Sequence, residues 1–138
     1  MDSVFYSHSG LAEASIDHEL LMRWLRAFLF TLVVEVPIFV VLVRGAVPAW
    51  RAAIAGAAGT FLTHPLLIFV WRPFCQRHGF SYEEYIISGE LTVGVIESLT
   101  FYALARPIRL TRAIACSFIA NAASYGGGNL MRWLGWWH

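Results

Sequence analysis

The chain has 138 residues, of which 58% are hydrophobic and only 14% are charged, and its mean hydropathy is +0.60. This composition is typical of an integral membrane protein. The formal charge of +1 comes with ten scattered arginines and no lysine, so no basic stripe exists that would bind nucleic acid.

Four apolar stretches are long enough to cross a bilayer as helices, because about 20 helical residues span a core about 30 Å thick. In chain order they cover approximately residues 24–43, 50–71, 85–105 and 108–125. Pro48, Pro73 and Pro107 fall at or beside their ends, where a missing N–H costs least. We therefore predict an all-α membrane protein with four transmembrane helices, forming one integral membrane domain over residues 1–138. No cleavage pattern follows the first stretch, so we expect that span to stay in the mature protein.

The first two predicted helices each carry polar residues on one face. Glu35 is about halfway along the first, with Thr31 one turn earlier. His64 is just past the middle of the second, and Thr60 and Thr63 share its face. An acid at the centre of a membrane helix costs roughly 2.5–3.5 kcal/mol on insertion scales, so such residues indicate function. We expect His64 to be the proton partner of the acids.

The third and fourth predicted helices have matching polar faces. Glu90 and Glu97 lie two turns apart on the third, with Glu97 near its middle. Asn121 is a little past the middle of the fourth, flanked on its face by Ser117 and Ser124. Polar side chains at similar depth can form hydrogen bonds with one another when the four polar faces point inward. The aliphatic residues then face the lipid.

Two prolines interrupt the first two helices beside these residues. Pro37 follows Glu35 by two positions and Pro65 follows His64 directly. Each lacks an N–H and leaves the carbonyl four residues earlier without its helical donor. Oxygen and imidazole groups in one place suit a proton, a small cation or a divalent metal.

The sequence also repeats itself at an offset of 62 residues. The pattern of Glu, Phe, Leu and Arg at Glu35, Phe39, Leu42 and Arg44 recurs at Glu97, Phe101, Leu104 and Arg106. One residue of slippage then aligns Thr60 with Asn121, Thr63 with Ser124 and His64 with Tyr125. We predict two parallel helical-hairpin repeats, over approximately residues 24–71 and 85–133, related by an axis along the membrane normal.

Small residues on the second helix indicate close helix packing. They are Ala52, Ala55, Gly56, Ala58 and Gly59. This face is either an internal contact or the seam of a homodimer, and we expect a dimer because four short helices enclose little volume. Alternatively, the chain serves as a subunit of a larger membrane complex. A second small-residue feature, the run of glycines at 126–128, either ends the fourth helix or permits close backbone approach.

Membrane orientation follows from the loops. The arginines divide five against five between the two sides, so they do not decide it. Acids gather on the side of the termini, at Asp2, Glu13, Asp17, Glu19, Glu83 and Glu84. We therefore expect an integral protein of the cell membrane with both termini on the non-cytoplasmic side. Glu83 and Glu84 are interpreted as solvated or helix-capping residues outside the site.

Two function classes fit these residues. The first is transport or conduction of a proton or small cation, with a binding site formed by Glu35, His64, Glu90, Glu97 and Asn121. Supporting polar residues are Thr60, Thr63, Ser117 and Ser124. The alternative is a membrane-embedded metal-dependent hydrolase or peptidase, whose divalent metal would be held by Glu35, His64, Glu90 and Glu97. Transport is favoured because a catalytic zinc normally takes two or three nitrogen or sulphur ligands, and only one imidazole is available. A third class, a serine or cysteine hydrolase, is dismissed because no G-x-S-x-G nucleophile motif is present.

Overall fold

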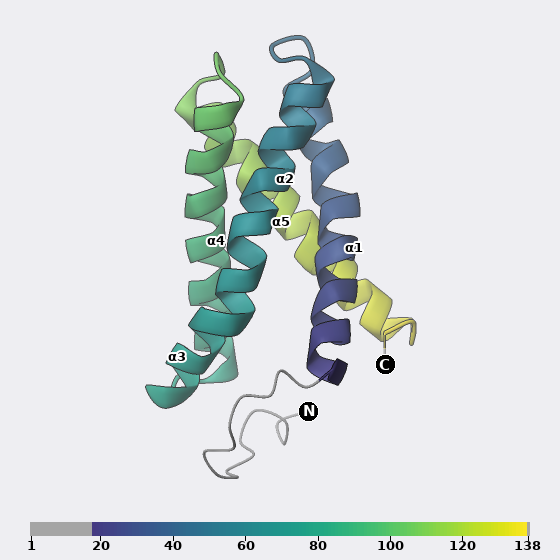
Figure 1. Ribbon diagram of the computed structural model, residues 1–138, viewed down its shortest axis with the longest axis vertical. Helices are drawn as coiled ribbons and strands as arrows, with labels where there is room; N and C mark the ends of the chain where they lie inside the picture. Colours follow the sequence, from purple (N-terminus) through teal and green to yellow (C-terminus); the bar gives the residue numbers. More distant parts are fainter. Residues whose placement is uncertain (1–17, 138) are drawn as a thin grey trace.

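A computed structural model describes residues 18–137 of the chain, and in that part every element is helical (Figure 1). The elements in order are α1 (His18–Leu42), α2 (Ala49–Leu66), the π-helical segment η2 (Leu67–Trp71), α3 (Arg72–Arg77), α4 (Tyr82–Leu104) and α5 (Leu110–Trp133). Because α2, η2 and α3 follow one another without a break, they form one rod. The predicted all-α class is confirmed.

Three of these helical segments are long and apolar enough to cross a membrane. They are α1, the rod of residues 49–77, and α4. Helix α5 has 24 residues, which is sufficient length, but it is the least apolar of the four. Its crossing of the membrane therefore stays a prediction, as does the orientation. Of the acids used to orient the chain, Asp2, Glu13 and Asp17 lie outside the described residues.

The helix ends differ from the predicted spans for local reasons. Helix α4 begins at Tyr82 because Ser81 and Glu84 form a capping box, with Ser81 N donating to Glu84 Oε2 (2.7 Å) and Glu84 N to Ser81 Oγ (3.2 Å). The capping role predicted there is confirmed for Glu84. Helix α5 continues through the glycines at 126–128, so these do not end it. A Cβ on Gly127 would lie 3.1 Å from Phe30, which fits the alternative of close approach.

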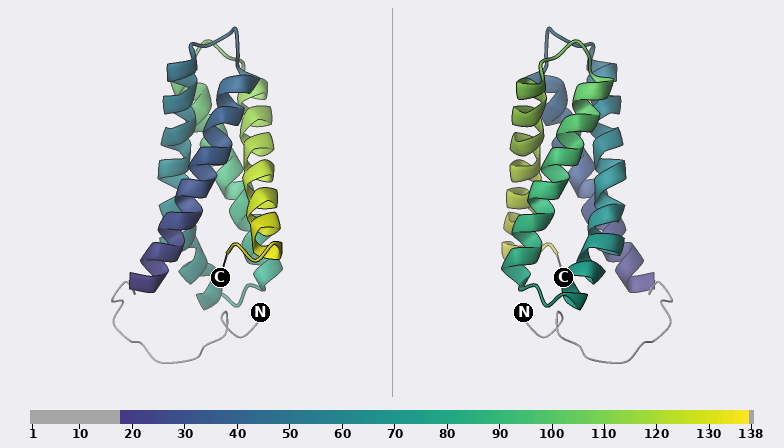
Figure 2. Two further views of the ribbon diagram at one scale, coloured as in Figure 1. Left: turned by 90° about the vertical axis from the view of Figure 1, so that its right-hand side faces the viewer. Right: turned by 90° about the vertical axis from the view of Figure 1, so that its left-hand side faces the viewer.

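The four long helical segments form a ring. Helix α1 packs against α2 and α5, and α4 also packs against α2 and α5, so α1 and α4 lie diagonally opposite. Both hairpin loops are at one end of the bundle, and the C-terminal end of α5 and the connection from α3 to α4 are at the other (Figure 2). The helices come together at the loop end and spread toward the opposite end.

The loop end of the bundle is closed by apolar side chains. The rings of Phe39 and Phe101 meet there with their centroids 4.5 Å apart, and Val43 and Ala105 are fully buried beside them. We name the contact between the two rings the Phe39–Phe101 plug. A Cβ on Gly56 would lie 2.6 Å from Phe39 Cδ2, so glycine is required for the helices to approach.

The small-residue face of α2 is an internal contact. Ala52, Ala55, Gly56 and Gly59 are all buried within the single chain, against residues of the other helices such as Phe39 and Glu97. The alternative interpretation of this face as a dimer seam is therefore wrong, because α1 and α4 already cover it. A homodimer would need another surface.

Candidate functional site

Glu35 of α1 is fully buried and is held from two other helices. Thr60 Oγ1 on α2 donates to Glu35 Oε2 (2.9 Å), and Ser124 Oγ on α5 donates to Glu35 Oε1 (2.6 Å). Both carboxyl oxygens thus have a hydroxyl partner, as a buried polar group requires. The structure brings the predicted residues of α1, α2 and α5 together here.

Glu97 of α4 is held in the same way. Thr63 Oγ1 on α2 donates to Glu97 Oε1 (2.7 Å), and Asn121 Nδ2 on α5 donates to Glu97 Oε2 (2.6 Å). The amide of Asn121 also donates to the carbonyl of Ser117 (2.9 Å), which fixes its orientation. Ser117 Oγ in turn donates to the carbonyl of Gly94 on α4 (3.1 Å). Thr63, Asn121 and Ser117 are all buried, so this half of the site is a rigid network.

The three hydroxyls of the site each lie between a carboxyl oxygen and a main-chain carbonyl. Thr60 Oγ1 is 3.3 Å from Gly56 O, Thr63 Oγ1 is 3.0 Å from Gly59 O, and Ser124 Oγ is 3.1 Å from Asn121 O. A hydroxyl has one proton and two lone pairs. Each can donate to an ionised carboxylate, or rotate to donate to the carbonyl while it accepts a hydrogen bond from a neutral carboxylic acid. The network therefore accommodates both protonation states.

His64 lies beside this network rather than within it. Its Nε2 is 3.3 Å from Thr31 Oγ1, its ring meets Phe28 at a centroid distance of 5.5 Å, and its buried Nδ1 has no hydrogen-bond partner among the described residues. We expected His64 to pair with the acids, but among the described residues it forms no hydrogen bond with Glu35, Glu90 or Glu97. Pro65 follows, and the helix widens into η2 two residues later, which fits the loss of a backbone donor.

A cavity of about 370 Å³ connects these groups to one end of the bundle. Its inner part is lined by Glu35, Glu97, Thr63, Asn121 and Ser124, with His64, Thr31 and Tyr125 at its wall. Glu90 lines it farther out, two turns before Glu97 on α4. All five residues of the predicted ion site therefore border one cavity.

The carboxyls are closer to the loop end than to the opposite end of their helices. Glu35 lies seven residues before the end of α1 at Leu42, and Glu97 lies seven before the end of α4 at Leu104. At 1.5 Å per residue, the loop end is about 10 Å away. The Phe39–Phe101 plug fills this short distance. The site is therefore separated from one side by a thin apolar layer and open to the other.

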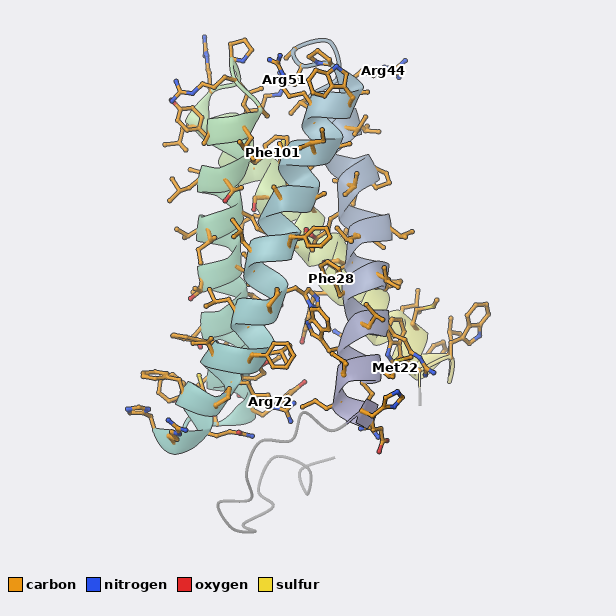
Figure 3. The ribbon with its side chains drawn as sticks, in the orientation of Figure 1. Met22, Phe28, Arg44, Arg51, Arg72 and Phe101 are labelled. Atoms are coloured by element: carbon orange, nitrogen blue, oxygen red, sulfur yellow. The ribbon has the colours of Figure 1, made fainter. Side chains whose placement is uncertain are left out.

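The outer part of the cavity holds residues that the sequence analysis missed. They are Arg72, Tyr82, Tyr85 and Arg132. Figure 3 shows Arg72 at the same end of the bundle as Met22, with Arg44 and Arg51 at the opposite end. Arg72 directly follows the interfacial Trp71, so the sequence indicated its depth. That it faces a cavity depends on how α2, η2 and α3 are rotated, which the sequence does not reveal.

The donor geometry does not favour a metal centre. Among residues 18–137, the structure contains no group of three or more His, Cys, Asp or Glu side chains that could hold a metal ion. Cys75 and Cys116 are both buried and unpaired with each other. The residues proposed as metal ligands, Glu35, His64, Glu90 and Glu97, thus border the cavity without forming a shared coordination sphere.

Comparison of the chain with protein-family models, curated proteins and solved structures found no match. Its function is therefore inferred from the chemistry of the site itself.

Proposed function

We propose that the protein is a four-span membrane carrier in which Glu35 and Glu97 bind and release a proton or a small cation. One observation carries this proposal: two buried carboxyls, each hydrogen-bonded from both α2 and α5, lie at the inner end of a cavity that opens to one side. Ionisable residues inside membrane helices are costly and mark ion pathways.

Electrostatic repulsion among the acids favours a positively charged ligand. Glu35 repels both Glu97 and Glu90 when these carboxyls are ionised. A bound proton or cation relieves this repulsion, because it neutralises one of the like charges. The rotating hydroxyls of Thr60 and Ser124 then supply hydrogen bonds to Glu35 both before and after proton binding.

The pairing of donors with acids supports an internal duplication. Glu35 is bonded by Thr60 from its own hairpin and by Ser124 from the other. Glu97 is bonded by Asn121 from its own hairpin and by Thr63 from the other. Aligned positions of the two repeats thus play aligned roles, as a twofold axis between the hairpins would require.

The loop end supports the same interpretation. Phe39 and Phe101, which are equivalent in the repeats, meet each other. Arg51 Nη1 donates to the carbonyl of Arg106 (3.3 Å), and the equivalent Arg112 donates through Nη2 to the carbonyl of Leu42 (2.7 Å). Each arginine thus joins its own hairpin to the end of the other, and the two contacts resemble each other across the axis.

The thin closed end is consistent with a carrier. Only about 10 Å of apolar packing lies between the carboxyls and the loop end. A small movement of the Phe39–Phe101 plug would expose the site to the second side, as alternating access requires. A metal-dependent hydrolase finds less support, because the acids and His64 form no three-donor group in the described part of the chain.

Proton and cation flux in liposomes tests the proposal. Purified protein is reconstituted with a pH-sensitive dye inside, and an imposed pH or sodium gradient is followed for wild type, Glu35→Gln and Glu97→Gln. We expect both variants to remain folded, because removal of a buried ionisable group relieves desolvation, and both to lose flux to a comparable degree.

Glu83→Gln is the matched control. Glu83 is exposed in the first turn of α4, away from the cavity, so its neutralisation should leave flux unchanged. Wild-type flux in both Glu35→Gln and Glu97→Gln would refute the proposed function. A large loss in Glu83→Gln alone would place the site at the N-terminal end of α4.

A further inference from the structure

The cavity carries opposite charges at its two ends. Glu35 and Glu97 line the inner end, and Arg72 and Arg132 line the outer end. Arg72 and Arg132 form no salt bridge with a carboxylate among residues 18–137, where the single ion pair joins Arg23 and Glu19 on α1. The acids and arginines of the cavity are thus kept apart rather than neutralising one another.

The arginines at the outer end bear on which cation enters. A guanidinium is always charged and repels an inorganic cation that approaches alone. It attracts a carboxylate or phosphate, with which it forms paired hydrogen bonds. The outer end therefore selects an anionic group, whereas the inner end selects a positive one.

The distance between the two ends sets the size of a matching molecule. Arg72 follows Thr63 by nine residues along the α2 rod, and Arg132 follows Asn121 by eleven along α5. At 1.5 Å per residue, the charged ends are separated by about 14–16 Å along the helices. The cavity volume of about 370 Å³ lies within the range of small-molecule sites, about 300–1,000 Å³.

The middle of the cavity is mixed. The apolar side chains of Ala27, Leu67, Ile86 and Val93 line it, and Glu90 adds a third carboxyl between the two charged ends. The apolar side chains suit methylene groups. The carboxyls thus occupy the inner part and the middle of the cavity, and the arginines occupy its outer end.

We propose that this cavity binds an extended dipolar molecule, with an amine at Glu35 and Glu97, a carboxylate or phosphate at Arg72 and Arg132, and a chain long enough to join the two ends. This inference rests on the proposed function, because it uses the same carboxyls as the positive-charge site. It names the substrate class: an amine with a distant anionic group, rather than an inorganic cation alone.

Calorimetric titration of the purified wild-type protein with aminoalkyl phosphates tests the inference. The probes are aminoethyl, aminohexyl and aminodecyl phosphate, with decylamine and decyl phosphate as single-ended controls. We expect the longest dipolar probe to bind most tightly, because only it reaches both ends. Each single-ended control should bind at least about tenfold more weakly, since it forgoes one charge-assisted contact.

Variants at each end separate this inference from the proposed function. Arg72→Gln and Arg132→Gln should each weaken the binding of aminodecyl phosphate at least about tenfold. Neither should weaken the binding of decylamine, because the lost guanidinium only repels a lone cation. Arg44→Gln, at the opposite end of the bundle, is the matched control and should bind like wild type.

The outcomes are distinguishable. If aminodecyl phosphate binds no better than decylamine, or binds equally to Arg72→Gln and wild type, the dipolar ligand is refuted. The carrier proposal is judged separately, by the flux of Glu35→Gln and Glu97→Gln in the absence of any probe. Loss of that flux together with failure of probe binding would leave a proton or inorganic cation as the cargo.

Discussion

Gly56→Ala directly tests the packing that closes the bundle. The added Cβ would lie 2.6 Å from Phe39 Cδ2, whereas carbon atoms in contact are normally about 3.5–4.0 Å apart. Phe39 has little room to move, because it is buried and its ring meets Phe101. Overpacking of this kind costs about 1–3 kcal/mol.

Gly126→Ala is the matched control, because Gly126 is also inside a helix but has no atom within 4 Å of the added Cβ. Both substitutions gain about 1 kcal/mol of helix propensity, so the difference in stability between the two variants isolates the cost of overpacking. At about 4 °C per kcal/mol for a chain of this size, Gly56→Ala should melt about 4–12 °C below Gly126→Ala. Circular dichroism of the two variants in detergent measures this. Equal melting temperatures would refute the internal packing of the small-residue face, and recovery in Gly56→Ala/Phe39→Leu would support it.

Two further predictions concern the site and its closed end. Thr63→Val keeps the shape of the side chain but removes the hydroxyl between Glu97 and Gly59 O, so proton flux should fall about tenfold or more. Thr63→Ser keeps the hydroxyl and should keep the flux. Equal flux in the two variants would contradict the role of the hydroxyl. Phe101→Ala removes one of the two rings of the Phe39–Phe101 plug, so it should lower the free energy of unfolding by about 3–5 kcal/mol and allow a passive proton leak in liposomes. Phe30→Ala, at the edge of the bundle, should cause no leak. The same leak in both variants would argue against a seal at Phe101.

Much of the fold follows from the sequence because helix formation and burial have local signals. Apolar runs of about 20 residues predicted all four long helices, and the spacing of Glu35, Glu97 and Asn121 predicted inward polar faces. Glu35 and Glu97 are buried, whereas Glu90 is partly exposed. Carboxyls are rare inside membrane helices, so these residues could be chosen as candidates without tertiary detail.

The partners within the site could not be predicted in the same way. Glu35 is bonded by Ser124, which lies 89 residues away, and this pairing depends on the rotation and height of α5 against α1. His64 was expected beside the acids but contacts Thr31, because a shift of one helical position decides which side chain faces it. The outer arginines were missed for the same reason. Sequence periodicity gives faces of helices but not the register between them.

The two halves of the site differ in one donor, and this difference has a chemical consequence. Glu35 has a hydroxyl on each side, whereas Glu97 has the Thr63 hydroxyl on one side and the Asn121 amide on the other. A hydroxyl can reverse its hydrogen bond, but an amide nitrogen only donates. A proton on Glu97 is thus confined to the oxygen that faces Thr63, while a proton on Glu35 has a place on either oxygen. In the proposed carrier, the two acids are therefore unequal stations, and unequal stations give a proton a preferred order of binding and release.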